Sequence, residues 1–288
     1  MVCPVCRSNK IEYYHQKNEY KLYRCLNCEL VFVSPVPIDL NKVYTKEYFK
    51  SKNGDSGFGY ADYDKDKEAM EEIFLAYLDK IEKLAFGRNI FDVGTATGYF
   101  LNLAKNRGWQ TAGVEISDYA AGIARSRGHD VYGGRLPEIK IEDRFNAVTM
   151  WDVLEHLDNP EEYLRAVNKI LVSDNGWLII NTVNRGSFWA RLLGRRWHLI
   201  VPPEHLFYYS PKNLKMLLQR TGFEIKEMKR MGKRFSLSYI FKILCHWQGL
   251  EIWRKFSEYF NKPFWRKFSF PINLGDNILI IAKKIKDV

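Results

Sequence analysis

The alternation of apolar and polar positions between residues 66 and 182 predicts a regular succession of helices and strands. Apolar side chains such as Phe74, Tyr77 and Ile81 recur at helical spacing, which predicts a helix over residues 66–84. Strands are predicted over residues 88–93, 110–115, 130–132, 147–151 and 177–182, with helices over 99–107, from 117 and from 160. Strands and helices that alternate in this way indicate a doubly wound α/β sheet with right-handed crossovers.

The C-terminal part of the chain has a different pattern. Ser210 and Pro211 predict the start of a helix, and strands are predicted over residues 223–231 and 278–284. The insert between these strands, residues 232–275, is rich in Trp, Phe, Lys and Arg. Its simplest interpretation is an amphipathic helix pair with buried rings. A lid, a dimer face, stacking on RNA and, over residues 235–270, peripheral contact with a membrane remain open.

Composition narrows the class of protein. The 288 residues are 46% hydrophobic and 15% aromatic, which suits one large domain with a small appendage. The opening residues, Met-Val-Cys-Pro-Val-Cys, have no basic start followed by an apolar stretch, and no apolar run has the length of a bilayer span. We therefore expect a cytoplasmic protein.

Positive charge is concentrated near the C-terminus. Residues 226–288 contain 14 Lys and Arg against 5 Asp and Glu, while the net charge of the whole chain is +10. An anionic partner is one interpretation (a nucleotide-linked substrate, a nucleic acid or a membrane surface), and a solvated basic face is the other. DNA is not expected, and RNA is disfavoured because residues 1–40 hold 5 Lys and Arg against 4 Asp and Glu.

Four cysteines form two pairs with the spacing of a zinc site. Cys3 and Cys6 are followed, after 18 intervening residues, by Cys25 and Cys28, and each C-x-x-C turn offers two sulfur ligands. Disulfides are not expected in a reducing compartment. A module of this length cannot bury enough core to fold unaided. We therefore predict a zinc-ribbon-like module over residues 1–38 with one structural Zn²⁺ on the four thiolates.

A glycine-rich turn follows the strand at residues 88–93. Residues 90–98 read Ile-Phe-Asp-Val-Gly-Thr-Ala-Thr-Gly, and Glu115 ends the next apolar run. Small residues at 94, 96 and 98 let the backbone turn sharply and approach a ligand closely. An acid at the end of the second strand can accept hydrogen bonds from both ribose hydroxyls. Asp92 suits a ligand with a cationic amino group and would repel a pyrophosphate.

This stretch resembles the first motif of class I S-adenosylmethionine-dependent methyltransferases, and the resemblance covers residues 67–288, after a linker at 39–66. It implies a seven-stranded Rossmann-like sheet with an antiparallel final hairpin, and an S-adenosylmethionine cofactor. The methionine end would contact the glycine loop, and the ribose would contact Glu115. The residues expected at the cofactor are Asp92, Gly94, Thr95, Ala96, Gly98, Tyr99, Glu115, Ile116, Gly134, Leu136, Trp151 and Asp152.

Candidate catalytic residues follow the strands at 147–151 and 177–182. Methyl transfer from a sulfonium is an in-line displacement, so the enzyme has to hold the acceptor atom and manage its proton. Residues at the carboxyl ends of these strands face the cofactor in this architecture. We predict His156 as the general base because imidazole titrates near neutrality, His205 as second choice or partner, and Glu155 as a third candidate.

The segment Asp152-x-x-Glu155-His156 also resembles the E-x-x-E-H element of ubiquinone-pathway O-methyltransferases and small-RNA 2′-O-methyltransferases, with Asp152 in place of the first Glu. Those families bind a divalent ion there, so the resemblance implies Mg²⁺, Mn²⁺ or Zn²⁺ at these three residues. A metal-free base is the favoured alternative, because related small-molecule methyltransferases with Leu-Glu-His need no metal. Simple packing of the loop is the third interpretation.

The cysteine pairs, Asp-Val-Leu-Glu-His and Pro-Pro-Glu-His-Leu together resemble bacterial zinc-knuckle methyltransferases related to the C-methyltransferases of nucleotide-linked deoxysugars. The sequence lacks the long extra C-terminal domain of the sugar enzymes, so oxygen, nitrogen and carbon acceptors remain open. The leading interpretation is methylation of a small, anionic or nucleotide- or sugar-linked metabolite. An RNA methyltransferase and a cofactor-binding scaffold without catalysis are the alternatives. The sequence leaves the oligomeric state open.

Overall fold

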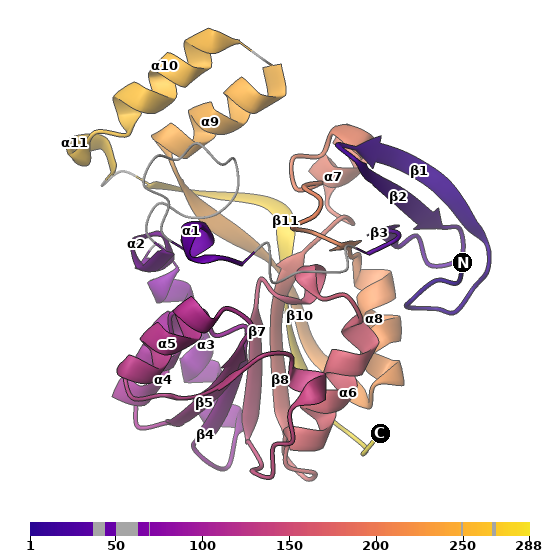
Figure 1. Cartoon of the computed structure of the whole chain (residues 1–288), viewed down its shortest axis with the longest axis vertical. Helices are drawn as coiled ribbons and strands as arrows, with labels where there is room; N and C mark the ends of the chain where they lie inside the picture. The colour runs from indigo at the N-terminus through magenta and orange to yellow at the C-terminus, as the bar shows by residue number, and fades with distance from the viewer. Residues whose placement is uncertain (37–43, 50–62, 69, 249, 267–268) are drawn as a thin grey trace.

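The computed structural model describes residues 1–36, 44–49, 63–68, 70–248, 250–266 and 269–288 (Figure 1). A seven-stranded sheet with the order β10-β11-β8-β7-β4-β5-β6 forms its centre. In chain order its strands are β4 (Asn89–Val93), β5 (Gln110–Glu115), β6 (Asp130–Gly133), β7 (Ala147–Trp151), β8 (Trp177–Val183), β10 (Phe223–Ser236) and β11 (Ser269–Lys284). The neighbouring strands β8, β7, β4, β5 and β6 pair in parallel. Strand β11 is antiparallel to both β8 and β10. The predicted Rossmann-like sheet with its antiparallel final hairpin is confirmed.

Helices cover both faces of this sheet because successive strand residues point to opposite sides. The helices are α3 (Glu71–Leu84), α4 (Tyr99–Asn106) and α5 (Asp118–Ser126) on one face, and α6 (Pro160–Ile170) and α8 (Pro211–Arg220) on the other (Figure 1). Ile90 of β4 packs in one core cluster with Phe74 and Leu101, while its neighbour Phe91 packs in the other with Leu164. The two helix layers therefore each have their own core.

Three features differ from the sequence prediction. The helix expected over residues 66–84 is divided into α2 (Tyr63–Glu68) and α3, so that Lys67 and Phe74 do not belong to one continuous helix. Strands β10 and β11 each extend several residues beyond the predicted hairpin. Most of the predicted linker lies outside the described residues; its described parts are α2 and the short helix α1 (Lys46–Phe49).

The N-terminal module is joined to the large α/β domain by strand pairing. Its strands are β1 (Ile11–Lys17), β2 (Tyr20–Cys25) and β3 (Val31–Val33), and they form a sheet of order β1-β2-β3-β9 with β9 (Phe207–Tyr208). Val31 pairs with Tyr208 and Phe32 with Phe207, both antiparallel. The two parts also share one continuous hydrophobic core, in which Leu22 and Leu30 belong to the same cluster as Leu214. The module is therefore integrated into the fold.

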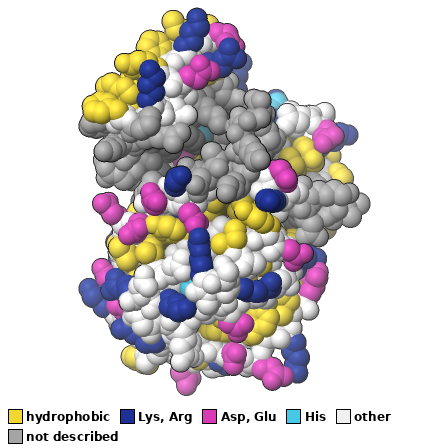
Figure 2. Space-filling model, turned by 60° about the vertical axis from the view of Figure 1, so that its left-hand side comes forward, with side chains coloured by type: hydrophobic (Ala, Val, Ile, Leu, Met, Phe, Trp, Pro, Cys, Tyr) yellow, Lys and Arg dark blue, Asp and Glu magenta, His cyan; other side chains and the backbone are white. Residues whose placement is uncertain are grey.

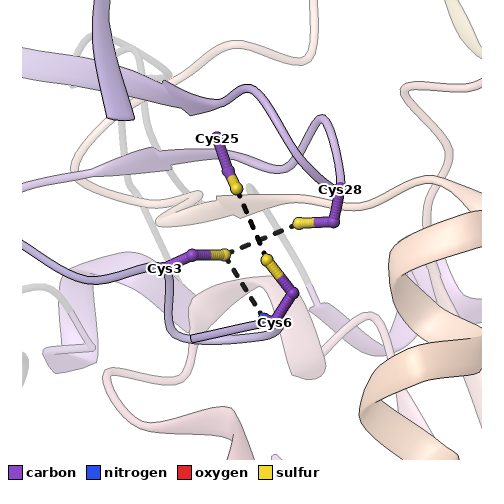
Figure 3. Close-up of side chains that lie close together, drawn as sticks. All are labelled: Cys3, Cys6, Cys25 and Cys28. Carbon is purple, nitrogen blue, oxygen red and sulfur yellow. Dashed lines mark hydrogen bonds between the residues drawn. The ribbon is translucent and has the colours of Figure 1, made fainter. Parts of the chain in front are cut away.

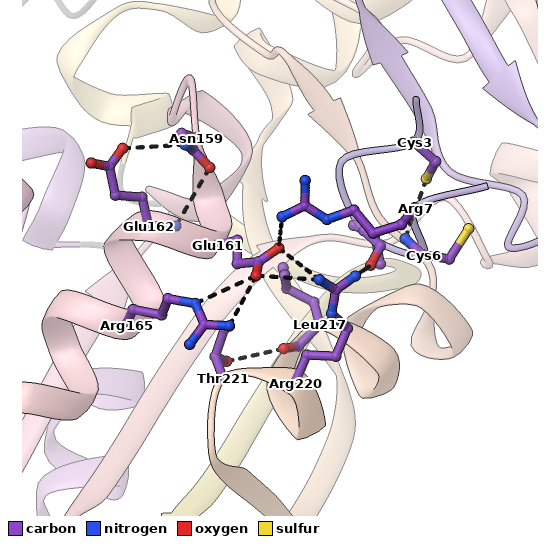
Figure 4. A network of polar contacts seen from close by, with 11 residues as sticks. Cys3, Cys6, Arg7, Asn159, Glu161, Glu162, Arg165, Leu217, Arg220 and Thr221 are labelled. Atoms are coloured by element: carbon purple, nitrogen blue, oxygen red, sulfur yellow. Dashed lines mark hydrogen bonds and ion pairs between the residues drawn. The ribbon is translucent and has the colours of Figure 1, made fainter. Parts of the chain in front are cut away.

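A buried carboxylate reinforces this junction (Figure 4). Glu161 at the start of α6 accepts ion pairs from Arg7 of the module at 2.6 Å, from Arg165 at 3.1 Å and from Arg220 of α8 at 3.2 Å. Arg220 also donates a hydrogen bond to the backbone oxygen of Val5 at 2.6 Å. A single acidic side chain thus connects the first cysteine turn of the module with two helices of the large domain.

The basic, aromatic insert forms a helical hairpin at the far ends of β10 and β11 (Figure 1). It consists of α9 (Leu237–Gln248), α10 (Glu251–Phe260) and α11 (Pro263–Arg266). Phe241 of α9 stacks with Trp253, Phe256 and Phe260 of α10, with ring centroids 5.7, 5.3 and 5.2 Å apart. The expected helix pair with packed rings is therefore present. None of the helices that the structure describes is long and apolar enough to cross a membrane.

Candidate active site and metal centre

A cavity of about 230 Å³ lies at the carboxyl ends of the parallel strands. The carboxyl edge of a parallel sheet is where strand ends and their following loops leave room for a ligand. The cavity is bounded by the loop after β4, the end of β5, the segment after β7, the loop before β9, and helices α1 and α2. The predicted site residues that line it are Gly94, Ala96, Glu115, Ile116, Gly134, Leu136, Trp151, Asp152, Glu155, His156 and His205.

Four predicted cofactor residues lie outside this main cavity. Asp92, Thr95 and Tyr99 line a small adjoining hollow, which shares Lys67 and Trp151 with the cavity. Gly98 lines neither space. Its φ is +82°, and an added Cβ would lie 2.9 Å from the ring of His129, so this glycine is required for packing at the start of α4.

The turn after β4 and the acid at the end of β5 hold each other in place. Gly94 has φ +71°, and a Cβ there would lie 2.7 Å from Val153. The N–H groups of Ala96 and Ser117 donate to the two carboxylate oxygens of Glu115 at 2.8 and 2.9 Å. Burial raises the pKa of Glu115, and these hydrogen bonds oppose that rise. The carboxylate keeps further lone pairs for two hydroxyl groups of a ligand.

The adjoining hollow combines donors with an acid. Asp92 is buried and accepts a hydrogen bond from the Thr149 hydroxyl at 2.6 Å, and burial raises its pKa to about 7. The Lys67 ammonium lies 3.8 Å from Asp152. The indole N–H of Trp151 is buried without a hydrogen-bond partner in the part of the chain that the structure describes. Such a site complements a ligand with both an amino group and a carboxylate, because it offers both signs of charge and an unused donor.

Two histidines also line the cavity, and their hydrogen bonds determine their tautomers. The Nδ1 atom of His156 lies 2.6 Å from the backbone oxygen of Glu204, and that of His205 lies 2.8 Å from the backbone oxygen of Leu199. A carbonyl oxygen can only accept, so Nδ1 carries the hydrogen in each ring and Nε2 keeps the lone pair. The ring centroids are 4.9 Å apart. Both rings can therefore accept a proton or bind a metal through Nε2.

The structure corrects the candidate divalent-ion set. The ligand atoms of Glu155, His156 and His205 all lie within 4.8 Å of one another. Asp152 does not belong to this group because its carboxylate accepts a hydrogen bond from Asn181 at 2.5 Å and pairs with Lys67. His205, which is distant in the sequence, takes the place that Asp152 was expected to occupy.

Glu155 is fixed from two sides within this group. The Thr182 hydroxyl donates to its carboxylate at 2.7 Å, and its backbone oxygen accepts the N–H of Leu206 at 2.8 Å. Burial raises the pKa of this carboxyl group, which is 1% exposed. This backbone hydrogen bond from Leu206 ties the segment after β7 to the loop that carries His205.

Sequence reasoning missed the aromatic residues that close the cavity. Tyr44 places its hydroxyl 3.0 Å from Nδ1 of His156, and Tyr48 donates to the Glu204 carboxylate at 2.9 Å. Phe49 and Tyr63 complete this wall, with ring centroids 5.6 Å apart. The high tyrosine content of the predicted linker was the one available signal for this role.

The four cysteine sulfurs converge as a metal site requires (Figure 3). The Sγ atoms of Cys3 and Cys28 are 3.5 Å apart, as are those of Cys6 and Cys25, and all four lie within 4.8 Å of one another. A tetrahedral zinc ion with Zn–S bonds of about 2.3 Å sets its sulfurs about 3.8 Å apart. The cysteines are not joined in disulfides. The four residues therefore fit one zinc ion.

The order of the seven strands, the glycine turn after β4 and the acid that ends β5 together define a class I S-adenosylmethionine-dependent methyltransferase. Residues 65–227 match the model of the methyltransferase domain family, and the chain belongs to this family.

Among curated relatives, the ubiquinone biosynthesis O-methyltransferase of Chromobacterium violaceum is 27% identical over 190 residues, which are 59% of this chain and 81% of the relative. The Burkholderia multivorans protein of the same name is 25% identical over 188 residues, or 59% and 80% of the two chains. Two solved structures share the fold. A Thermotoga maritima S-adenosylmethionine-dependent methyltransferase has a TM-score of 0.50 and 22% identity, covering 78% of this chain and 94% of its own. The magnesium protoporphyrin IX methyltransferase of Synechocystis, solved with S-adenosylhomocysteine, has a TM-score of 0.50 and 13% identity, covering 80% and 90%.

Proposed function

We propose that this enzyme transfers the methyl group of S-adenosylmethionine to a hydroxyl oxygen of a small, uncharged acceptor. One observation carries the proposal: Gly94 and Glu115 line the same cavity as His156 and His205. An acceptor beside the histidines would therefore lie within reach of a cofactor held by the glycine turn. The relatives named above are O-methyltransferases, which supports oxygen as the acceptor atom.

The cofactor would occupy the end formed by β4 and β5. Glu115 would accept hydrogen bonds from the two ribose hydroxyls, and Ile116 would pack on the adenine, with Gly134 and Leu136 at its edge. At the methionine end, Asp92 would bind the amino group, while Lys67 and Trp151 would bind the carboxylate. Bound S-adenosylmethionine supplies an electrophilic methyl group.

The described lining argues against the anionic acceptor that the charge of the chain suggested. Its carboxylates are Glu115, Asp152, Glu155 and Glu204, and its one basic side chain, apart from the two histidines, is Lys67. This environment repels an anion. The aromatic wall of Tyr44, Tyr48, Phe49 and Tyr63 favours instead an acceptor with a planar or apolar body. We therefore propose a neutral hydroxylated molecule as the acceptor.

His156 would serve as the general base. Its Nε2 lone pair would take the proton of the acceptor hydroxyl, and the Glu204 carbonyl, already bonded to Nδ1–H, would stabilise the imidazolium that forms. His205 has the same tautomer and would hold the acceptor from the other side or take the proton in its place. The Tyr44 hydroxyl beside the His156 ring would limit its rotation.

A divalent ion on Glu155, His156 and His205 is the alternative arrangement, favoured by the proximity of their ligand atoms. In that case both Nε2 atoms would be ligands, as expected when Nδ1–H is bonded to a backbone carbonyl. Activity would then disappear with a chelator that leaves the cysteine-bound zinc in place and return with added Mg²⁺ or Mn²⁺. Full activity in such a chelator would exclude this arrangement.

We also propose that Cys3, Cys6, Cys25 and Cys28 hold one structural zinc ion. The sulfur separations support it, because they match a tetrahedral site. Freshly purified protein should contain one zinc per chain. Metal analysis that finds none in unchelated protein would remove the claim.

The function is tested with cofactor labelled in the methyl group and incubated with a cell extract or with neutral phenols and alcohols. The wild type should yield a labelled small molecule with a new O–CH₃ group. Glu115→Ala should weaken cofactor binding in calorimetry by about 1.5–3 kcal/mol, the range for hydrogen bonds to a charged group. His156→Ala should reduce turnover by about 10²–10⁴-fold at nearly unchanged cofactor affinity.

Glu138→Ala is the matched control, since this exposed acid pairs only with Arg135 among the described contacts and does not line the cavity. It should behave as the wild type. Label that appears on nitrogen or carbon, or cofactor affinity that is unchanged in Glu115→Ala, would contradict the proposal.

A further inference from the structure

Helix α10 exposes a stripe of apolar side chains to solvent. Ile252, Phe256 and Tyr259 are 55%, 41% and 50% exposed, and their spacing of four and three residues puts them on one face of the helix. Leu250, which precedes α10, and Phe264 of α11 are also exposed, at 51% and 66%. Exposed large apolar side chains that adjoin one another usually mark a surface that binds something.

The rest of α10 shows that this stripe is not simply the packing face of the hairpin. Trp253, Phe256 and Phe260 all stack on Phe241 of α9, and the Ser257 hydroxyl donates to the backbone oxygen of Ser238 at 3.0 Å. Phe256 therefore lies at the border between the packing face and the stripe, whereas no described ring contact joins Ile252 or Tyr259 to α9. The apolar arc of α10 is therefore wider than the surface that α9 covers.

Charged residues occupy the opposite side of α10. Glu251 and Glu258 both pair with Arg254, at 2.8 and 3.9 Å. The helix thus has a packing face, a charged face and a free apolar face.

Basic side chains border the apolar stripe. Lys255 of α10 lies beside the stripe in the helical sequence. The Nζ atom of Lys262 lies 5.1 Å from the centroid of the Tyr259 ring. Residues 237–266, which form the hairpin, carry five Lys and Arg against two Asp and Glu. A second copy of this chain would bring like charges together on such a surface. An apolar stripe with tyrosine and lysine at its border instead matches the interface of an anionic bilayer.

The position of the hairpin leaves this stripe accessible. Asn277 of β11 pairs with Val183 at the carboxyl end of β8, so the part of β11 that precedes Asn277 extends beyond the sheet on the side of the cavity. Figure 1 shows the hairpin beyond the ends of β10 and β11, and Figure 2 shows hydrophobic side chains on it together with basic and acidic ones. Asn277 itself lines the cavity. A surface bound by the hairpin would therefore lie on the cavity side of the molecule.

We propose that the helical hairpin docks this enzyme on anionic lipid surfaces, with the stripe of α10 inserted among the lipid head groups and the bordering lysines on their phosphates. The inference goes beyond the proposed methyl transfer and does not depend on it. Binding of this kind combines buried apolar area with electrostatic attraction, so it should weaken when salt is added.

The test is cosedimentation of the full-length protein with vesicles of phosphatidylcholine that do or do not contain phosphatidylglycerol. The wild type should sediment with the phosphatidylglycerol vesicles and much less with phosphatidylcholine alone. The double variant Ile252→Glu/Tyr259→Glu should lose at least about tenfold in apparent affinity. Phe86→Glu is the matched control, because Phe86 is 92% exposed and lies between α3 and β4, at the opposite end of the sheet.

Cofactor affinity is measured for every variant to show that the site is intact, and it should not change. Three results would overturn the proposal. The wild type could bind both vesicle types equally weakly, or the double variant could bind as the wild type does. Sedimentation equilibrium could also show a wild-type dimer that the double variant dissociates, which would make the stripe a self-association surface.

Discussion

The N-terminal module and the C-terminal hairpin are both additions to the same seven-stranded sheet, but they are attached in opposite ways. The module completes a second sheet with β9, shares the main core and is bound through Glu161. The hairpin is carried on the ends of β10 and β11, and its described aromatic contacts join α9, α10 and α11 to one another. The N-terminal module therefore supports the loop beside the active site. The hairpin does not support the site and leaves an apolar surface exposed to solvent.

The module contacts the loop that carries His205 at several points. Val33 donates to the backbone oxygen of Leu206 at 2.9 Å, immediately after His205, and the Leu206 N–H in turn donates to Glu155. Earlier in the loop, the Lys17 ammonium donates to the backbone oxygen of Ile200 at 2.5 Å. The module therefore forms hydrogen bonds with this loop both before and after His205.

Loss of the zinc site should produce the largest effect. Cys25→Ser should disorder the turns around the metal and release β3 from β9, because metal binding and folding of such a module are coupled. Methyl transfer should fall by at least about 10²-fold, since a misplacement of about 1 Å is sufficient for that. The assay is run with added Mg²⁺, so that any divalent ion at the histidines is not limiting. Cofactor affinity should remain close to that of the wild type. Full turnover in a variant shown to lack zinc would show that the module does not support the active site.

Glu161→Gln should have the next largest effect. It leaves Arg7, Arg165 and Arg220 without their shared carboxylate, which is nearly buried, although the arginines themselves are partly exposed. After allowance for that exposure, the free energy of unfolding measured by denaturant titration should fall by about 1–3 kcal/mol. The exposed pair of Glu138 and Arg135 offers a control, and Glu138→Gln should change stability by less than about 0.5 kcal/mol. Equal effects of the two changes would show that the junction is not held by Glu161.

The same carboxylate should make the junction sensitive to acid. Burial opposes ionisation of Glu161, but hydrogen bonds from Arg165 and Arg7 outweigh it and hold its pKa below the usual 4.5. A carboxyl group with a lowered folded pKa contributes stability that is complete above its unfolded pKa and is lost as the pH falls through the folded value. The stability advantage of the wild type over Glu161→Gln should therefore shrink below about pH 4.5. An advantage that stays constant down to pH 3 would contradict this assignment.

Phe241→Ala should affect only the hairpin. It removes the ring that stacks with Trp253, Phe256 and Phe260. The local cost should be about 1–3 kcal/mol, visible as faster amide exchange in α9 and α10. Turnover and the exchange of β8 should be unchanged. A loss of turnover comparable to that of the zinc-site variant would show that the hairpin also supports the active site.

Arg254→Ala should have the smallest effect. Its ion pairs with Glu251 and Glu258 are exposed and lie within one helix, so the change in stability should stay within about 0.5 kcal/mol. Exchange rates in α10 should match those of the wild type. A loss as large as that of Phe241→Ala would show that charge, and not the stacked rings, holds the hairpin together.

Local patterns were sufficient to predict the sheet and half of the site. The glycine turn and Glu115 are contiguous with strands whose periodicity is plain, and the paired cysteines have a spacing that only a few sites share. These features depend on neighbours in the sequence, so the residues that carry them can be identified without coordinates.

The remaining features depend on contacts between distant segments. Strand β9 has two residues and exists because β3 pairs with it. Tyr44 and Tyr48 reach His156 and Glu204 from more than a hundred residues away. Asp152 has the sequence spacing of a metal ligand, yet its carboxylate contacts Asn181 and Lys67 and does not lie with Glu155 and the histidines. No periodicity indicates such contacts.

The central claim is that the N-terminal module positions the loop that carries His205, and amide hydrogen exchange over residues 206–208 tests it most directly. The zinc-loaded protein should protect these amides through the pairing of β3 with β9 and the bond from Leu206 to Glu155. Removal of the zinc should reduce that protection by at least about tenfold, while protection in β8 and in α10 stays as it was. Unchanged protection of residues 206–208 in a stripped protein whose cysteine turns exchange freely would contradict the account.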